Sequence, residues 1–152
     1  MFKGHKNLVL YWYLKMDCIF CKIINNEIKS QKVYEDNDVI AILDINPINK
    51  GHILVIPKKH YETIFDIDDE VLKKTITVVK KIALALKKMG AEGVNIVQNN
   101  GKAAEQHVFH IHFHVVPRYF NDGMKIARGN RIKYKDDKEM QEYAEKIRLF
   151  LF

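Results

Sequence analysis

The stretch His107-Val-Phe-His110-Ile-His112-Phe-His114-Val-Val-Pro117-Arg118 holds four of the seven histidines of the 152-residue chain. Histidine and hydrocarbon residues alternate through its middle, and this period of two predicts a half-buried β-strand over residues 108–116. One face would carry imidazoles and the other would pack on the core, which fixes the register. We expect Pro117 to end the ladder because proline has no N–H to donate. The residues expected on the core face are Phe109, Ile111, Phe113 and Val115.

Three histidines in strict alternation favour a chemical role for this strand. Imidazole has an ordinary pKa near ~6.5, so at neutral pH it can act as an acid, a base, a nucleophile or a metal ligand. Residues two apart on a strand are separated by roughly 7 Å, so neighbouring histidines can act on one substrate or take different tasks. A single strand histidine is more often structural, with its N–H donated to a backbone carbonyl.

The composition predicts one globular domain of ordinary size, with 47% hydrophobic and 29% charged residues. A net charge of +6 favours anionic substrates in general terms. The lysine pairs are spread over expected helix faces and strand ends, so we do not expect a nucleic-acid partner. Both cysteines lie in one Cys-x-x-Cys, which argues against a secreted disulfide framework, and we expect a cytoplasmic protein.

Three segments are expected: an N-terminal extension of residues 1–16, a main domain of residues 17–119 and a C-terminal tail of residues 120–152. The apolar run from Leu8 to Leu14 is too short to span a bilayer, and we expect no association with a membrane. Its basic start is not followed by the small-residue cleavage site of a signal peptide. Deletion of residues 1–15 is expected to leave activity intact.

Four further strands are predicted at residues 31–35, 39–44, 52–56 and 93–98, the first two flanking a turn-forming Asp-Asn-Asp and the third stopped by Pro57. From residue 66 to residue 89 the apolar period becomes helical, with Asp66 or Asp68 as N-cap and Gly90 as the stop. The apolar positions of this helix are Val71, Leu72, Ile76, Val79, Ile82, Ala83 and Leu86.

Two shorter helical segments flank this region, one at residues 18–25 and a terminal helix at residues 136–150. Residues 99–106 form a polar loop before the histidine-rich strand. The connections are too short for repeated parallel crossovers, so the class is α+β with a five-stranded antiparallel sheet. The apolar face of the terminal helix would carry Met140, Tyr143, Ala144, Ile147 and Phe150.

The run His110-Ile-His112-Phe-His114-Val-Val resembles the His-φ-His-φ-His-φ-φ signature of the histidine triad (HIT) family of nucleotide hydrolases and transferases. Four other runs resemble further landmarks of that family in the same order: Cys18–Ile24, Leu43–Pro47, Gly51–His60 and Gln98–Gly101. The resemblance covers about residues 17–119 and is nearest to the Hint-like branch. It implies a HIT-like fold with one long helix, a short N-terminal helix and a C-terminal helix.

Cys18 and Cys21 form half of a tetrahedral zinc site. In zinc-bearing relatives, the resemblance implies that His60 and His110 complete the set. Four protein ligands leave no open coordination position, so such a zinc would be structural. A redox-active pair of cysteines is one alternative, but the βαβ unit that usually surrounds such a pair is not predicted here. Two buried thiols without a metal are the other alternative. No organic cofactor is expected.

The resemblance also implies catalytic roles. His112 would attack the α-phosphorus of a nucleotide and form a covalent nucleotidyl-histidine that water hydrolyses, which suits a neutral imidazole because it needs no separate base. The backbone carbonyl of His110 would hold the other ring nitrogen of His112. His114 and His52 would donate to phosphate oxygens as charge develops. Gln106 would contact the phosphate or the leaving group.

The nucleotide would be held by residues from several segments. Asp44 would accept both ribose hydroxyls, Asn99 would bind phosphate or ribose, and Gly101 would allow close approach of the backbone to a phosphate. The alternative for the loop residues Asn99 and Gly101 is that they only shape a turn, and the alternative for the apolar residues is that they only pack in the core. The apolar pocket for a purine would comprise Ile19, Phe20, Ile23, Ile42 and Ile45.

The run Glu105-Gln106-His107 departs from the small residues that often flank this glutamine in relatives. His107 could alter substrate choice or itself protonate the departing amine or phosphate. Glu105 adds negative charge beside the expected phosphate site, which would weaken phosphate binding unless the side chain points away.

The leading interpretation is a purine nucleoside phosphoramidate hydrolase that splits P–N bonds, as in adenosine 5′-monophosphoramidate, into AMP and an amine. A dinucleoside polyphosphate hydrolase of the same fold is an alternative, since Val116-Pro117-Arg118 also occurs in that branch. A nucleotide-binding adaptor with incidental turnover and a zinc-binding module are others. Relatives commonly pair their sheets edge to edge, so a homodimer is expected.

Overall fold

The computed structural model describes residues 17–124 and 132–150, so the expected extension of residues 1–16 lies outside the described residues. The chain divides into two units, Met1–Asp122 and Gly123–Phe152. Within the described residues, no helix combines the length and the apolar character needed to cross a membrane.

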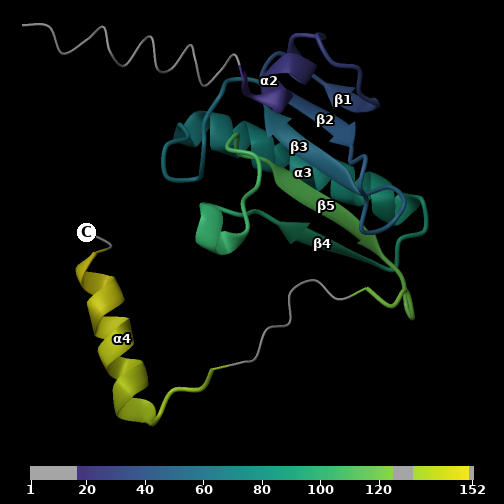
Figure 1. Ribbon diagram of the computed structural model, residues 1–152. Coiled ribbons are helices and arrows are strands. Elements are labelled where there is room, and N and C mark those ends of the chain that lie inside the picture. The colour runs from purple at the N-terminus through teal and green to yellow at the C-terminus, as the bar shows by residue number, and fades with distance from the viewer. Residues whose placement is uncertain (1–16, 125–131, 151–152) are drawn as a thin grey trace, which may run out of the picture. The chain divides into compact units, whose positions relative to one another are not determined.

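The first unit is built on an antiparallel sheet with the strand order β1-β2-β3-β5-β4 (Figure 1). The predicted α+β class with five antiparallel strands is confirmed, as are the short N-terminal, long central and C-terminal helices. The elements are α2 (Ile19–Ile24), β1 (Lys32–Glu35), β2 (Val39–Leu43), β3 (Ile53–Pro57), α3 (Asp69–Lys88), β4 (Gly93–Val97), η1 (Lys102–Ala104), β5 (Phe113–Arg118) and α4 (Asp137–Leu149).

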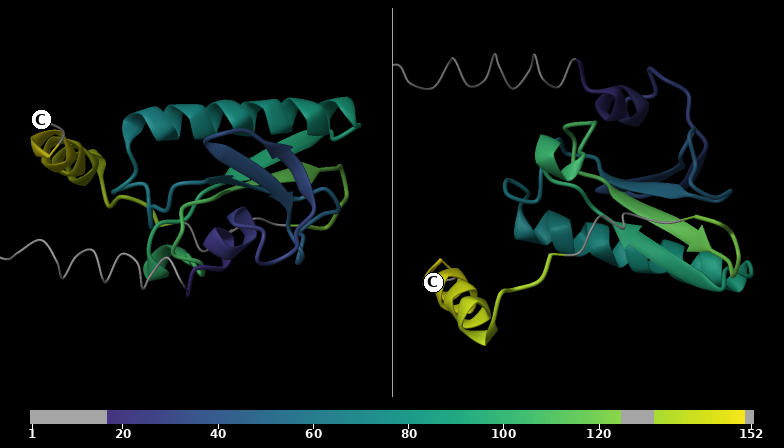
Figure 2. Two further views of the ribbon diagram at one scale, coloured as in Figure 1. Left: turned by 90° about the horizontal axis from the view of Figure 1, so that it is seen from above. Right: turned by 60° about the horizontal axis from the view of Figure 1, so that its bottom comes forward.

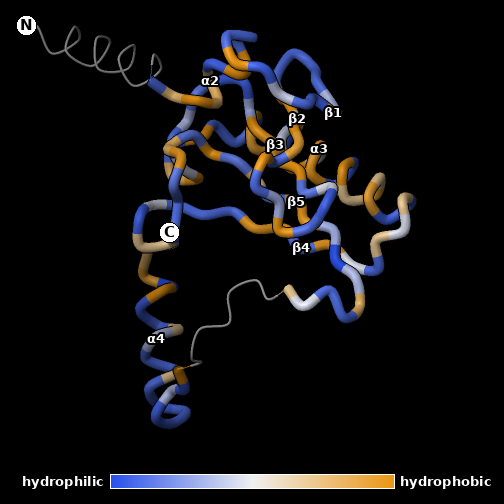
Figure 3. Tube along the Cα trace, turned by 45° about the vertical axis from the view of Figure 1, so that its right-hand side comes forward, coloured by the Kyte–Doolittle hydropathy of each residue, from blue (hydrophilic) through white to orange (hydrophobic). Residues whose placement is uncertain are grey.

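The sheet lies between two helices, with α3 along one face and the short α2 on the other (Figure 2). Side chains of the inner strand β2 alternate between these faces: Val39 and Ala41 join the cluster with α3, whereas Ile40 and Ile42 join the cluster with α2. Because both faces are covered, β2 and β3 are apolar at almost every position, and hydrophobic residues concentrate in the centre of the sheet (Figure 3).

Helix α3 packs on the sheet through a stripe that excludes the predicted Ile76 and includes Thr75 and Val78, which were not predicted. Ile76 was expected to be buried but is 44% exposed, whereas the neighbouring Thr75 is fully buried. The Thr75 hydroxyl donates to the Val71 carbonyl at 2.8 Å, which satisfies this polar group inside the core. Thr75 lies near the middle of the buried stripe, so Ile76, which points about 100° away from it, falls outside the stripe. The buried residues of α3 are Thr75, Val78, Val79, Ile82 and Leu86.

The N-cap of α3 was predicted to be Asp66 or Asp68. Asp68 occupies the N-cap position, but its side chain does not cap the helix. It accepts hydrogen bonds from the Tyr61 hydroxyl and from Lys59 Nζ instead. Asp66 accepts from the backbone of the preceding turn, at Thr63 among others. The C-terminal stop is confirmed, because Gly90 has a φ of +105°.

Strand β5 begins at Phe113, later than the predicted start at residue 108. The cause lies at the end of β3, where the Lys58 N–H donates to the Asp38 carbonyl on the β2 side. Successive residues face opposite neighbours, so the nitrogen and carbonyl of Pro57 face β5. Pro57 has no N–H to donate, and its carbonyl accepts from Nε2 of His110 at 2.8 Å. The β3–β5 ladder therefore stops before the first histidines of the triad.

Pro117 lies inside β5 and does not end the ladder, contrary to the prediction. The Glu92 N–H donates to the Arg118 carbonyl at 3.0 Å, so Arg118 faces β4 and the nitrogen of Pro117 faces the other neighbour, β3. Strand β3 begins at Ile53, which pairs with Val115. Pro117 is beyond that pairing, so its missing N–H costs no ladder bond.

The second unit contains α4, close to the predicted residues 136–150. Asp136 is its N-cap, and its carboxylate accepts from the Glu139 N–H at 2.8 Å. The expected apolar positions Met140, Tyr143 and Ile147 are each about half exposed. Hydrophobic spacing thus predicted the helix correctly, and its apolar face is not buried within this unit.

Candidate active site and metal centre

Four buried side chains meet where α2 packs against the sheet. Cys18 and Cys21 come from the N-cap and first turn of α2, His60 from the segment after β3, and His110 from the segment before β5. Their ligand-type atoms all lie within 4.8 Å of one another. Nδ1 of His110 is 3.4 Å from Sγ of Cys18, and Nδ1 of His60 is 3.4 Å from Sγ of Cys21. The structure thus brings together the four residues expected to hold a metal.

The protonation of this cluster suits a divalent cation. Nε2–H of His110 donates to the Pro57 carbonyl, so the neutral ring turns its unprotonated Nδ1 toward the sulfur atoms. Hydrogen bonds from Cys21 and from the two histidines outweigh burial and lower the pKa of Cys18 to about 2. Two cysteine sulfurs and two imidazole nitrogens form one of the common tetrahedral zinc sets. A tetrahedral ion here would have no open position, because all four ligands are protein side chains.

His112 follows this cluster and presents a single unprotonated ring nitrogen. Its Nδ1–H donates to the backbone carbonyl of His110 at 2.7 Å, so Nε2 carries the lone pair in the neutral ring. The ring is 8% exposed and meets Phe20 edge-on at a centroid distance of 5.0 Å. Burial lowers the pKa of His112 to about 4, so the imidazole is neutral at pH 7.

His52 and His114 form a directed chain of hydrogen bonds beside His112. The Ile48 N–H donates to Nδ1 of His52 at 3.1 Å, which leaves the proton of a neutral His52 on Nε2. Nε2–H of His52 then donates to Nδ1 of His114 at 2.9 Å, so a neutral His114 carries its proton on Nε2. Burial lowers the pKa of both rings. The His112 and His114 rings are 5.0 Å apart, which places a lone pair and an N–H donor side by side.

Asp44 lies beside this chain, with Oδ2 3.6 Å from Nε2 of His52. Asp44, His52 and His114 bring three ligand-type atoms within 4.8 Å of one another. A metal on Nε2 of His52 would require a proton on Nδ1, where the Ile48 N–H already points. The arrangement therefore favours a hydrogen-bonded chain over a second metal site.

The loop before the triad is held together by Gln106. Oε1 of Gln106 accepts from the Gly101 N–H at 2.7 Å, and Nε2 donates to the Glu62 carbonyl at 2.6 Å and to the Val108 carbonyl at 3.1 Å. The side chain is 3% exposed and acts as a brace. Its expected contact with a phosphate or leaving group stays a prediction. Gly101 has a φ of +85°, a conformation that favours glycine.

These residues can carry out nucleophilic substitution at an oxyanion centre. The lone pair on His112 can attack an electrophilic atom, and the N–H of His114 can bind oxygen atoms on which negative charge develops. Phosphoryl groups have both features.

The comparisons with known proteins agree with this geometry. Residues 25–121 match the model of the HIT domain. The chain belongs to the histidine triad (HIT) family. An uncharacterized HIT-like protein of Methanocaldococcus jannaschii is 56% identical over 74% of this chain and 87% of its own length. A crystal structure of a HIT family member from Bacillus subtilis covers 90% of this chain and 98% of its own, with a TM-score of 0.82 and 41% identity.

Named relatives of this HIT chain include two enzymes and a zinc-bound structure. The adenosine 5′-monophosphoramidase hnt1 of Schizosaccharomyces pombe is 44% identical over 68% of this chain and 75% of its own. The adenylylsulfatase HINT3 of Arabidopsis thaliana is 39% identical over 91% of this chain and 71% of its own. A zinc-bound histidine triad protein from Mycobacterium smegmatis covers 89% of this chain and 96% of its own, with a TM-score of 0.71 and 37% identity.

The residues expected to bind a nucleotide occupy varied environments in this HIT chain. Phe20, Ile23 and Ile42 are buried in the α2 cluster, and Phe20 contacts the His112 ring. Ile19 is 44% exposed and Ile45 is 89% exposed. Asp44 and Asn99 are half-buried, and Asp44 Oδ1 accepts from the Asn46 N–H. Their roles in binding the base, ribose and phosphate stay predictions.

The two departures from the family pattern face different surroundings. His107 is exposed and lines a pocket of about 320 Å³ together with Ile19, Glu62 and Val108. Glu105 is exposed and ends η1 in the left-handed conformation, with a φ of +61°. The expected effect of His107 on substrate choice stays a prediction.

Sequence reasoning missed the contacts that orient His52. The Ile48 backbone donor has no side-chain signature, so no pattern of residue types could have found it. Asn49 was not singled out from the sequence, although its amide donates to the Pro117 carbonyl of β5. The sequence signal that could have pointed to these contacts is the short loop between the strand expected at residues 39–44 and His52.

Proposed function

We propose that this HIT protein hydrolyses purine nucleoside phosphoramidates through a covalent nucleotidyl-histidine. The enzyme class follows from the family and its named relatives: the chain is a hydrolase of the HIT type. The observation that carries the finer proposal is the His112 ring, which is neutral and holds its lone pair on Nε2 because Nδ1–H is bound to the His110 carbonyl. A phosphoramidase among the relatives supports the choice of substrate.

In the first step Nε2 of His112 attacks the α-phosphorus. A bond forms between this nitrogen and phosphorus while the bond from phosphorus to the leaving amine breaks, and the amine takes up a proton from solvent. The positive charge on the modified ring is stabilised by the His110 carbonyl, which keeps the hydrogen bond from Nδ1–H. In the second step water attacks phosphorus and releases a proton to solvent, the bond to His112 breaks, and AMP leaves with the neutral ring restored.

The neighbouring histidines stabilise charge on the phosphate. The chain from Ile48 through His52 leaves the proton of His114 on Nε2, where it can donate to a phosphate oxygen. This donor is set before the substrate binds, so no reorganisation is needed as charge develops. A positioned donor of this type typically contributes ~10²- to 10³-fold to the rate.

We propose that the Cys18, Cys21, His60 and His110 cluster holds a structural zinc. The fit rests on four buried donors of the types that zinc prefers and on the orientation of His110, whose Nδ1 faces the sulfur atoms. A zinc-bound relative supports the identity of the metal. When bound, the ion would link α2 to the segment after β3 and to the segment before β5, and it would take no part in the chemical step.

We further propose that the protein forms a homodimer through an edge of its sheet. Strands β1 and β4 are the outer strands, and an unpaired edge is a ready site for pairing with a second copy. Sedimentation of the purified chain would show a mass of two protomers, and a monomer would contradict it. A cytoplasmic location stays a prediction.

The substrate class can be tested by paired assays on leaving groups. Adenosine 5′-monophosphoramidate, adenylyl sulfate and a diadenosine polyphosphate all carry an α-phosphorus that His112 could attack. We expect the highest kcat/KM with the phosphoramidate, and a preference for the polyphosphate would replace the proposal with the other hydrolase interpretation. His112→Asn should abolish turnover and retain AMP binding. Undiminished turnover in His112→Asn would show that another residue or mechanism carries out the reaction.

A further inference from the structure

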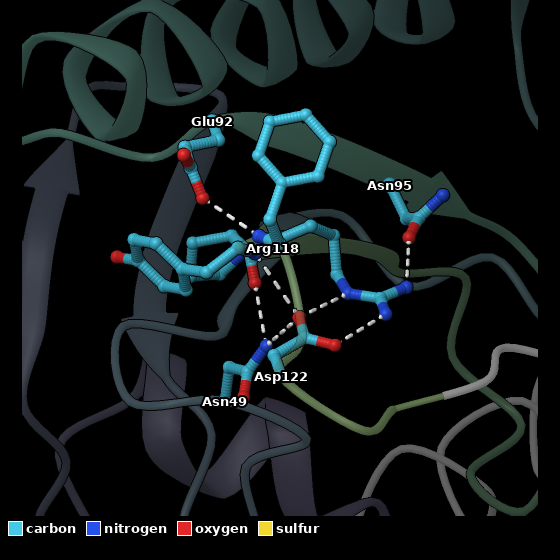
Figure 4. Close-up of polar contacts among 8 residues, drawn as sticks. Asn49, Glu92, Asn95, Arg118 and Asp122 are labelled. Atoms are coloured by element: carbon cyan, nitrogen blue, oxygen red, sulfur yellow. Dashed lines mark hydrogen bonds and ion pairs between the residues drawn. The ribbon is translucent and has the colours of Figure 1, made fainter.

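A carboxylate at the end of the first unit is fixed by an arginine (Figure 4). Nε and Nη2 of Arg118 each donate to one oxygen of Asp122 at 2.8 Å, a bidentate geometry that fixes both side chains. Nη1 of Arg118 donates to Oδ1 of Asn95 on β4 at 2.6 Å. The Asp122 side chain is 10% exposed and also accepts from the Tyr119 N–H. Asp122 is therefore a rigid acceptor next to β5.

This rigid acceptor reaches the loop that precedes His52. Nδ2 of Asn49 lies 2.9 Å from Oδ2 of Asp122 and 2.9 Å from the Pro117 carbonyl, so its two protons have two partners on the β5 side (Figure 4). The Pro117 carbonyl is available because β3 has not begun at this point. The Asn49 amide thus ties the loop to the end of the triad strand.

The same loop sets the orientation of His52. The His52 N–H donates to the Asn49 carbonyl at 3.0 Å, which closes a turn in which Gly51 has a φ of +92°. The residue before Asn49, Ile48, donates its N–H to Nδ1 of His52. Two consecutive residues of the loop therefore contact the backbone and the ring of His52.

We propose that Asn49 and Asp122 are positioning residues that fix the tautomers of His52 and His114. This inference rests on the proposed function, in which His114 donates from Nε2 to phosphate. If the loop moved, the Ile48 N–H would leave Nδ1 of His52, and the ring could carry its proton there. Nε2 of His52 would then accept from Nδ1–H of His114, and the neutral His114 would lose its Nε2 proton. A contact remote from the substrate thereby controls a donor in the active site.

The test combines histidine NMR with kinetics on the full chain. Long-range ¹H–¹⁵N spectra report which ring nitrogen carries the proton, and they do not depend on turnover. Asn49→Ala is expected to mix the tautomers of His52 and His114 and to lower kcat for the phosphoramidate by about tenfold, with KM nearly unchanged. Asp122→Asn should act in the same direction, because in either orientation its amide places an NH₂ group against an N–H donor of Arg118. This breaks the bidentate contact that fixes the acceptor of Asn49.

Asn95→Ala is the matched control because it removes another contact of Arg118 and leaves Asn49 and Asp122 in place. It should retain the tautomers and kcat of the wild type. The inference is wrong if folded Asn49→Ala and Asp122→Asn keep the wild-type tautomers, if tautomers change while kcat does not, or if Asn95→Ala has the same effect. Wild-type protein that does not hydrolyse the phosphoramidate would refute the proposed function, while the spectra would still show whether Asn49 sets the tautomers.

Discussion

The Nδ1–H of His112 donates to the backbone carbonyl of His110, whose own ring contributes Nδ1 to the Cys-His cluster. One residue therefore takes part in both candidate sites: its carbonyl orients the ring of the proposed nucleophile, and its side chain belongs to the proposed ligand set. The Pro57 carbonyl accepts from Nε2–H of the His110 ring. His110 thus supports both the Cys-His cluster and the proposed nucleophile.

Loss of the metal is expected to reduce stability more than turnover. Cys18→Ser combined with Cys21→Ser removes both sulfur ligands, so the purified variant should contain no zinc and melt at a lower temperature than the wild type. Below its melting temperature it should retain most of its phosphoramidate turnover, because His112 needs no metal. Elemental analysis and thermal unfolding check this prediction. A wild-type chain without zinc, or a folded double variant without any turnover, would contradict it.

The buried histidine pair should make stability depend on pH. Burial lowers the pKa of His52 and of His114 below the ordinary value of 6.5. As the pH falls below about 6.5, these histidines bind protons in the unfolded chain but not in the folded chain, so the free energy of unfolding decreases. Their contribution to stability is complete above about pH 6.5 and is lost as the pH falls toward their lowered pKa values in the folded protein. Urea unfolding at about pH 7.5 and about pH 5.5 should show the loss. His52→Gln with His114→Gln should reduce it, and an unchanged loss in that variant would count against the assignment.

His107 is expected to influence the choice of leaving group. It lines the pocket that contains Ile19 and Glu62, so its replacement changes the surface beside the proposed site. His107→Ser should alter the ratio of kcat/KM for amine and phosphate leaving groups more than it alters the overall rate. Glu105→Gln is a neighbouring control that should leave the ratio unchanged. Equal losses for both leaving groups in His107→Ser would refute this role.

The burial pattern of α3 predicts that replacing isoleucine by alanine at two positions of this helix will lower the free energy of unfolding by different amounts. Ile82 is 7% exposed in the core and Ile76 is 44% exposed. Ile82→Ala should lower the free energy of unfolding by about 2–5 kcal/mol, because it leaves a cavity between α3 and the sheet. Ile76→Ala should cost less than about 1 kcal/mol. Urea denaturation gives both values, and similar costs would mean that the packing stripe is wrongly placed.

The sequence predicted the order and kind of every described strand and α-helix, because burial imposes characteristic periods on their residues. It did not predict η1, which lies in the segment expected to be a polar loop. The sequence did not predict the features that depend on which residues of neighbouring strands pair, such as the effect of each proline on the ladder. Pro57 and Pro117 look alike in sequence, yet Pro57 faces β5 where a donor is needed and Pro117 lies past the end of β3. Only the register distinguishes them.

The candidate site could likewise be predicted only in part from the sequence. Residue types and the family resemblance predicted the metal cluster and the orientation of His112, both of which involve side chains with distinctive chemistry. The brace formed by Gln106 and the loop contact of Asn49 could not be predicted, since amides are common in loops and their partners are backbone groups brought together by the fold.

The central claim is that Nε2 of His112 becomes bonded to the nucleotide. The most direct measurement is mass spectrometry of peptides after single turnover with adenosine 5′-monophosphoramidate, quenched in base to preserve a bond between phosphorus and imidazole. We expect one adenylyl group on the peptide that contains His112, with fragment ions that place it on this residue and its absence in His112→Asn. Rapid turnover without an adduct, or an adduct on another residue, would contradict the account.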